Sequence, residues 1–165
     1  MISLHCRSLA DTHGVASALA NLARTGDVLI LSGEMGAGKT AFAQGFAAGL
    51  GVDEPVTSPT FTLVHTYDTG RVNLHHADLY RLDRLSEVAD LALAELVEGD
   101  GVLLVEWGDP AASMLGDHLE IRLLHDERDD DARLVTVRGV GRAWAARWER
   151  VEAAVASWRT RETPC

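Results

Sequence analysis

The most constraining feature of this chain is the segment GEMGAGKT, residues 33–40, which satisfies the pattern GxxxxGK[ST] at every fixed position. The residues before it, 28–31, form a short and wholly apolar run of the kind that becomes a buried strand. The residues after it, 40–50, are expected to form a helix. A strand, a glycine-rich loop and a helix in this order predict an α/β domain whose loop binds phosphate. The alternative is a chance match in a glycine-rich turn.

Each fixed position of this loop has a physical role. Glycines let the backbone turn its amide hydrogens toward phosphate oxygens, where a side chain would block the approach. We expect Lys39 to reach the terminal phosphates and the Thr40 hydroxyl to bind Mg²⁺. Lys39 is the only lysine beside fourteen arginines, and its flexible point charge suits phosphate. The residues expected to contact the nucleotide here are Glu34, Met35, Gly36, Ala37, Gly38, Lys39, Thr40 and Ala41.

A carboxylate is expected beside this loop, because Mg²⁺ takes oxygen ligands. Glu106 directly follows the apolar run 102–105, and parallel strands bring their carboxyl ends to one edge of a sheet. We therefore expect Glu106 to be the second protein ligand of the metal, with a solvated strand-end residue as the alternative. An Asp is more usual at this position in P-loop proteins, so the longer side chain leaves direct coordination open.

Asp78 is the second candidate carboxylate, because it follows the strand-like residues 72–77. It could hold a metal-bound water or orient the attacking water, and the alternative is a cap or turn residue. Residues 57–60, TSPT, are expected to form a loop, since Pro59 disfavours a helical conformation of the residue before it. The hydroxyls of this loop could sense the terminal phosphate, although such segments are more often plain turns.

The rest of the chain completes an α/β pattern. Strands are predicted at 2–6, 61–67, 72–77, 119–124 and 134–140, and helices from Asp11 or Thr12 to Gly26, from Ser86 to about residue 97, and at 142–159. The second and third strands should form a hairpin, and the acidic segment DERDDDAR should be the loop between the last two. We expect a single P-loop domain over residues 1–165, with a mostly parallel central sheet, antiparallel hairpin strands and flanking helices.

Composition limits the possible partners. The net charge of −10 opposes direct binding to a nucleic-acid backbone, which draws on clustered Lys and Arg. Cys6 and Cys165 have no metal-ligand spacing, and we expect two free thiols in an intracellular protein. The chain shows no signal segment and no apolar run long enough to span a membrane, so we expect a cytoplasmic location and no membrane partner.

Three other features have an ordinary structural explanation. His75 and His76 could suggest a metal site, but successive strand residues face opposite ways. The acidic residues 129–131 lack the spaced ligands of a calcium loop, so a solvated turn is expected. The tryptophans of residues 142–159 form one helical stripe. We expect this stripe to pack in the core, with a partner-binding face as the alternative.

The order GEMGAGKT, TSPTFTLVHTY, HHADLYRL and VLLVEW resembles the bacterial TsaE family, the small ATPases of tRNA threonylcarbamoyladenosine biosynthesis. The resemblance covers about residues 28–107, and SPTF, DLYRL and VEW make it far more specific than the loop alone. It implies an ATPase with Mg²⁺ that joins TsaB and TsaD and supports repeated threonylcarbamoyl transfer to adenosine in tRNA. It also implies that the chain does not carry the transferred group and meets tRNA only indirectly.

The resemblance also implies roles for individual residues. Lys39 and Thr40 fill the loop roles, Glu106 resembles the magnesium ligand, and Asp78 resembles the second functional carboxylate. Trp107 resembles a residue beside the nucleotide. Thr60, Tyr80 and Arg81 resemble parts of a mobile surround, Thr60 being also a candidate contact of the nucleotide. The chain departs from the family pattern at Ala77 and at residues 108–110, where the sequence Gly-Asp-Pro follows VEW.

Two other functions use the same loop. A small-molecule kinase would need an acceptor pocket and usually an arginine-bearing lid, and no segment has clustered arginines of that kind. Arg81 and Arg84 could stabilise transferred charge, although surface arginines are common. A non-hydrolysing module would use nucleotide only to fix its shape for a partner. The chain lacks an NKxD motif, the usual guanine-reading segment of GTPases of this class, so ATP is preferred to GTP. We also expect slow hydrolysis by the chain alone.

Overall fold

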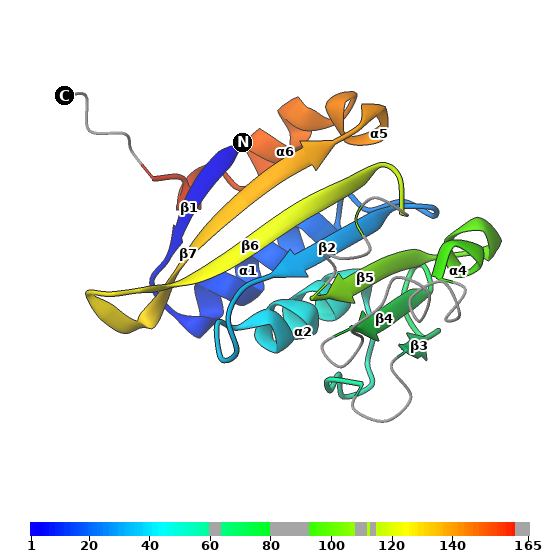
Figure 1. Ribbon diagram of the computed structural model, residues 1–165, viewed down its shortest axis with the longest axis horizontal. Helices are drawn as coiled ribbons and strands as arrows, with labels where there is room; N and C mark the ends of the chain where they lie inside the picture. Colours follow the sequence, from blue (N-terminus) through cyan, green and yellow to red (C-terminus); the bar gives the residue numbers. More distant parts are fainter. Residues whose placement is uncertain (60–63, 80–92, 108–111, 113–114, 161–165) are drawn as a thin grey trace.

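The chain folds around one sheet, which runs through the whole molecule in Figure 1. The computed structural model describes residues 1–59, 64–79, 93–107, 112 and 115–160. The strands are β1 (Ile2–Cys6), β2 (Val28–Ser32), β3 (Val64–Tyr67), β4 (Leu74–Asp78), β5 (Val102–Glu106), β6 (His118–Asp126) and β7 (Asp129–Val140). Within the described residues their order across the sheet is β1-β7-β6-β2-β5-β4-β3.

The centre of the sheet is parallel and its edges are antiparallel. β6, β2, β5 and β4 pair in parallel. β3 pairs antiparallel with β4, and β1 and β6 each pair antiparallel with β7. This arrangement confirms the predicted α/β domain with a parallel central sheet, and it confirms the predicted hairpin of β3 and β4.

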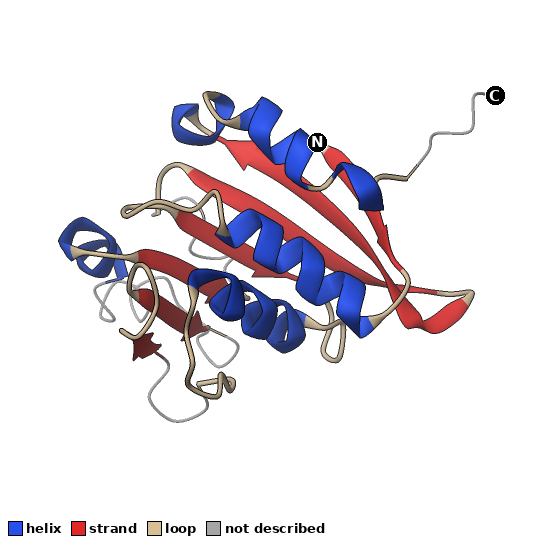
Figure 2. Ribbon diagram, turned by 180° about the vertical axis from the view of Figure 1, so that it is seen from behind, coloured by secondary structure: helices blue, strands red, loops and turns tan. Residues whose placement is uncertain are grey.

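The central strands β2 and β5 are buried along their whole length on both faces, which is why they read as continuous apolar runs. The helices are α1 (Leu9–Ala20), α2 (Lys39–Leu50), α4 (Leu93–Gly99), α5 (Arg142–Ala145) and α6 (Trp148–Ala154), followed by the 3₁₀ turn η2 (Ala156–Trp158). Leu29 and Leu31 of β2 share a core with α1 and α2, which lie side by side across one face in Figure 2. Val28 and Ile30 share the opposite core with α4.

The first helix starts earlier than predicted. Its cap is Ser8, whose side-chain oxygen accepts the amide of Asp11 at 3.2 Å, so neither Asp11 nor Thr12 is the cap. Asp11 instead accepts the amide of Arg7, the residue before the cap, at 2.9 Å, so its side chain also holds the start of the helix. The helix ends at Ala20, well before Gly26, because Asn21 closes its last turn.

Two predictions near the end of the chain are wrong in detail. The acidic segment is not a long loop, because β6 runs to Asp126 and β7 already begins at Asp129. Residues 129–131 are therefore strand residues, although they are exposed. The final helix is divided into α5, α6 and η2, with the break at Arg147, whose φ is −111° and whose guanidinium turns inward to Asp27.

The expected packing of the last segment is confirmed. The Trp144 side chain is fully buried, and Trp148 and Trp158 pack partly buried against the same core. Cys6 is a free, buried thiol, whereas Cys165 and the predicted cap Ser86 lie outside the described residues. Across the described parts of the chain, every helix is too short or too polar to cross a membrane.

Candidate functional site

The glycine-rich loop joins the end of β2 to the start of α2, as the sequence predicts. Gly33, Gly36 and Gly38 have φ values of 148°, 80° and 104°, which side chains rarely tolerate. A Cβ atom at Gly33 would also lie 2.5 Å from the carbonyl oxygen of Leu123 on β6. Glycine is therefore required here by both the turn and the close approach of β6.

Lys39 is the first residue of α2, and its side chain folds back over the loop. Its Nζ donates to the carbonyl oxygens of Gly33 at 2.7 Å and Glu34 at 2.9 Å. The same nitrogen lies 3.8 Å from the centre of the Trp107 ring. Burial lowers the pKa of the Lys39 ammonium below 10.5, and the charges of Glu106 and Asp78 oppose that shift. The loop thus holds one nearly buried cation against the pocket.

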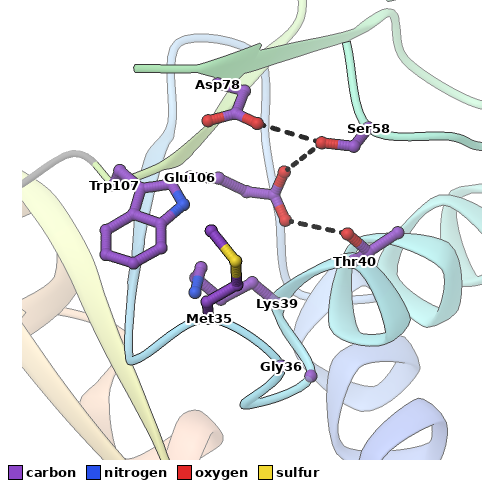
Figure 3. Close-up of a pocket in the computed structure, with 9 residues that line it drawn as sticks. Met35, Gly36, Lys39, Thr40, Ser58, Asp78, Glu106 and Trp107 are labelled. Atoms are coloured by element: carbon purple, nitrogen blue, oxygen red, sulfur yellow. Dashed lines mark hydrogen bonds between the residues drawn. The ribbon is translucent and has the colours of Figure 1, made fainter. Parts of the chain in front are cut away.

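Two carboxylates meet this loop at the ends of neighbouring strands. Asp78 ends β4, Glu106 ends β5, and the two are direct partners in the parallel ladder. The Thr40 hydroxyl lies 3.4 Å from Glu106 Oε1. The Ser58 hydroxyl lies 3.0 Å from Asp78 Oδ2 and 3.4 Å from Glu106 Oε2, so a chain of polar contacts crosses the pocket in Figure 3.

These residues line one pocket of about 310 Å³. Its lining consists of Met35, Gly36, Gly38, Lys39, Thr40, Ser58, Asp78, Glu106 and Trp107. The structure therefore brings most of the predicted site residues together, although their roles stay predictions. Thr60, Tyr80, Arg81 and Arg84 lie outside the described residues.

Trp107 occupies an unusual backbone position at the rim of this pocket. Its φ is 60°, and it is the only non-glycine residue with positive φ in the described ranges. Its amide donates to the carbonyl of Leu31 at 2.9 Å, which fixes the turn that follows β5. Such strained positions cluster at functional sites, and here the turn sets the indole over Lys39.

His76 belongs to the site, although the sequence analysis treated it as an ordinary strand residue. Its Nε2 lies 3.1 Å from Glu106 Oε2, and its side chain is fully buried. His75 faces away and contacts the Thr66 hydroxyl at 2.9 Å and the Asp100 carbonyl at 2.7 Å. The expectation that the two imidazoles face opposite sides of the strand is confirmed. The two-residue spacing between His76 and Asp78 was a usable signal, because both face the same side of β4.

Arg133 is a second residue that the sequence did not suggest. It lies on β7, and its guanidinium donates to the loop carbonyls of Ala37 at 2.9 Å and Gly36 at 3.5 Å. These contacts support the loop from outside the pocket. No local pattern marks Arg133, because only the pairing of β6 with β7 and β2 brings it to the loop.

A second pocket of about 400 Å³ adjoins the same loop. It shares Gly38 with the first pocket and continues along the first turn of α2 at Ala41. Its other lining residues come from the start of α1 and from β7, and they are Arg7, Ser8, Leu9, Thr12, Asp130, Asp131 and Arg133. The loop thus borders two hollows, and each is lined by two carboxylates and at least one cation.

Comparison with known proteins assigns this arrangement to a family. The family model described as "Threonylcarbamoyl adenosine biosynthesis protein TsaE" matches residues 6–135. The chain is 42% identical over 131 residues to the tRNA threonylcarbamoyladenosine biosynthesis protein TsaE of Bacillus subtilis, covering 79% of this chain and 81% of that protein. The chain belongs to the TsaE family. The match extends well beyond residues 28–107, where the sequence motifs lie.

Other relatives of the TsaE family agree with this assignment. The TsaE protein of Streptomyces coelicolor is 44% identical over 133 residues, which is 77% of this chain and 89% of that protein. The crystal structure of YdiB from Bacillus subtilis superimposes with a TM-score of 0.78 at 34% identity, covering 93% of this chain and 97% of that one. The superposition therefore extends well beyond residues 28–107, where the motifs lie.

Proposed function

We propose that this TsaE chain is a Mg²⁺-dependent ATPase that supports threonylcarbamoyladenosine formation in tRNA together with TsaB and TsaD. The observation that carries the proposal is the meeting of the Lys39 loop with Asp78 and Glu106 in one pocket. In this proposal the chain does not carry the transferred group, and its net charge of −10 is consistent with only indirect contact to tRNA. Action on tRNA also implies a cytoplasmic location.

The loop fits a nucleotide phosphate chain. Its glycines leave the inner surface free of side chains, and Gly38 directly precedes α2, whose N-terminal amides attract an anion. Lys39 has three N–H donors and uses two of them on loop carbonyls. These hydrogen bonds hold its positive charge beside the pocket. The loop amides and Lys39 would therefore hold the phosphates.

The oxygens of Thr40 and Glu106 fit a magnesium ion. Their separation of 3.4 Å is close to the spacing of about 3.0 Å expected for neighbouring ligands of an octahedral ion with bonds of about 2.1 Å. Bound Mg²⁺ would neutralise charge on the β and γ phosphate oxygens during hydrolysis. Thr40 and Glu106 would be its protein ligands.

Asp78 would then be the residue that orients the attacking water. Its Oδ2 lies 3.0 Å from the Ser58 hydroxyl, which holds the carboxylate in one orientation. A carboxylate oriented in this way can accept a hydrogen bond from a water molecule and align it. The contact between the Thr40 hydroxyl and Glu106 Oε1 supports this division of roles.

The second pocket extends the proposal to the rest of the nucleotide. Phosphates held between Lys39 and Ala41 would direct the ribose and base past Gly38 into the hollow between α1 and β7. Arg133 lines that hollow and also donates to the loop, so it would couple nucleoside binding to the shape of the loop.

Calorimetry with ATP and ADP, with and without Mg²⁺, tests the binding part of the proposal. We expect Mg²⁺ to tighten binding and Lys39→Ala to abolish it. Arg142→Ala, which removes an exposed cation outside both pockets, is the matched control and should bind normally. Equal binding by Lys39→Ala and the control variant would refute the phosphate site.

Release of free phosphate tests the reaction itself. We expect slow release by the chain alone and faster release once TsaB and TsaD are added, because many P-loop proteins complete their site when a partner docks. Full-speed release without those partners would contradict the proposal. Mass spectrometry that found a phosphorylated small molecule in place of free phosphate would favour the kinase alternative.

A further inference from the structure

His76 makes a polar contact to Glu106 inside the protein. The imidazole is 0% exposed and the Glu106 carboxylate 2%, and Nε2 lies 3.1 Å from Oε2. Both residues face the α2 side of the sheet, because His76 lies two positions before Asp78 on β4 and Glu106 is the strand partner of Asp78. The contact is shielded from solvent. A hydrogen bond to a charged group is stronger in such a buried position than in water.

The surroundings of His76 fix which nitrogen carries the hydrogen. A carboxylate oxygen accepts hydrogen bonds, so Nε2 donates to Glu106. Nδ1 is buried and has no hydrogen-bond partner among the described residues. The tautomer with its hydrogen on Nε2 suits both observations, because it leaves no N–H group at Nδ1 to satisfy.

This donor distinguishes the two oxygens of Glu106. Oε2 is engaged by His76 at 3.1 Å and lies 3.4 Å from the Ser58 hydroxyl. Oε1 is turned toward the Thr40 hydroxyl at 3.4 Å. Glu has one more rotatable bond than Asp, and a hydrogen bond to Oε2 removes the freedom that this bond would add.

We propose that His76 is a positioning residue that holds Oε2 of Glu106, so that Oε1 is the oxygen presented to a divalent cation beside Thr40. This proposal rests on the metal role of Glu106 in the proposed function. It also explains how a Glu can serve where an Asp is more usual. Hydrogen bonds to ligating carboxylates are a recognised means of orienting a metal site, and removing the outer partner typically lowers metal affinity by about 10- to 100-fold.

Magnesium coupling measures this role without using activity. The dissociation constant of ADP is measured by calorimetry in EDTA and in saturating Mg²⁺, and the ratio of the two reports how strongly metal and nucleotide support each other. We expect His76→Leu to keep the EDTA value, because the phosphate loop is untouched, and to lose most of the Mg²⁺ enhancement. His76→Gln should retain more of it, because its amide can still donate to Oε2.

His75→Leu is the matched control, because His75 is also a buried histidine and lies on the opposite face of the same strand. It should keep the full enhancement, and Glu106→Gln should lose it. If His76→Leu keeps the enhancement that Glu106→Gln loses, the positioning role is wrong while the metal role stands. If the wild type itself shows no enhancement, the proposed magnesium site fails.

Nitrogen-detected NMR of the imidazole provides a second measurement. It uses only the wild-type protein, so it does not depend on whether a variant folds. In the wild-type chain we expect His76 to show the Nε2–H tautomer with a hydrogen that exchanges slowly with solvent. A His76 signal of the Nδ1–H tautomer would overturn the proposal, because that form cannot donate to Glu106.

Discussion

Asp78 and Glu106 are direct partners on neighbouring parallel strands, and one hydroxyl, that of Ser58, lies within 3.5 Å of both carboxylates. A serine hydroxyl has one hydrogen, and the shorter contact of 3.0 Å assigns it to Asp78. Two carboxylates this close repel each other unless positive charge lies nearby. Lys39 lines the same pocket, which makes the arrangement suitable for a cation and a phosphate together.

Replacing Asp78 by Asn tests whether this carboxylate acts in hydrolysis or only in binding. Asn keeps the size of the side chain and can still accept from Ser58, but it loses the negative charge. We expect nucleotide affinity close to that of the wild type and phosphate release, measured with TsaB and TsaD present, lower by about 100-fold or more.

Asp100→Asn is the control for that variant, since Asp100 is an exposed acid that does not line the pocket. It should release phosphate at the wild-type rate. Phosphate release at the wild-type rate by Asp78→Asn would show that the Asp78 carboxylate has no role in hydrolysis. Intact support of tRNA modification by a variant that binds but does not hydrolyse would favour the non-hydrolysing module.

Gly33→Ala should weaken both the fold and the site. The new Cβ would meet the Leu123 carbonyl at 2.5 Å in a backbone conformation with φ of 148°. We expect a loss of about 1 to 3 kcal/mol in the free energy of unfolding, measured with urea, and weaker nucleotide binding. Gly99→Ala meets nothing within 4 Å and should leave both quantities almost unchanged. Equal stability of the two variants would show that the loop tolerates a side chain at Gly33.

Arg147→Met should be strongly destabilising. The Arg147 guanidinium forms a buried ion pair with Asp27, with contacts of 2.6 and 2.8 Å, and its loss leaves the Asp27 charge unpaired. We expect a loss of about 3 to 5 kcal/mol in the free energy of unfolding. Arg138→Met breaks the exposed pair with Glu120 and should cost less than about 1 kcal/mol. Similar losses for both variants would show that the buried pair has no special weight.

Cys6 should make stability fall at high pH. Burial raises the pKa of the Cys6 thiol from 9.0 to about 11, so the unfolded chain loses this proton at lower pH than the folded protein does. Its contribution is therefore complete below pH 9 and is lost as the pH rises toward 11, by about 2 to 3 kcal/mol in all.

Urea unfolding at pH 8 to 11 measures this loss in Cys165→Ser, where Cys6 is the only cysteine. The same chain with Cys6→Ala added should show a shallower decline. Parallel declines would contradict the raised pKa. At pH 8 the native thiol should also react slowly with a disulfide reagent, whereas urea should expose it at once.

Several features of this protein were decided by short-range sequence alone. The positions of β2, the loop and α2 follow from an apolar run, glycines that accept positive φ, and a following helix. The carboxylates Asp78 and Glu106 could be placed at one sheet edge, because parallel strands end there. Each of these inferences depends only on neighbours in the chain or on a general rule of sheet geometry.

Other features depended on the packing of distant segments. Two local features were also missed, namely the helix cap at Ser8 and the start of β7 at Asp129, because the sequence around each allowed a second interpretation. The break at Arg147 follows from its buried contact with Asp27, which lies 120 positions away. Strand order, the second pocket and the support of the loop by Arg133 arise from pairing between remote strands.

His76 stands between these two cases. Strand alternation put it on the same face as Asp78, which the sequence alone determined. Its contact with Glu106 required the parallel register of β4 and β5 and burial from solvent, which only the tertiary structure decided. The physical reason is that a residue type and its spacing limit which way a side chain points, whereas the partner it meets depends on which strand packs beside it.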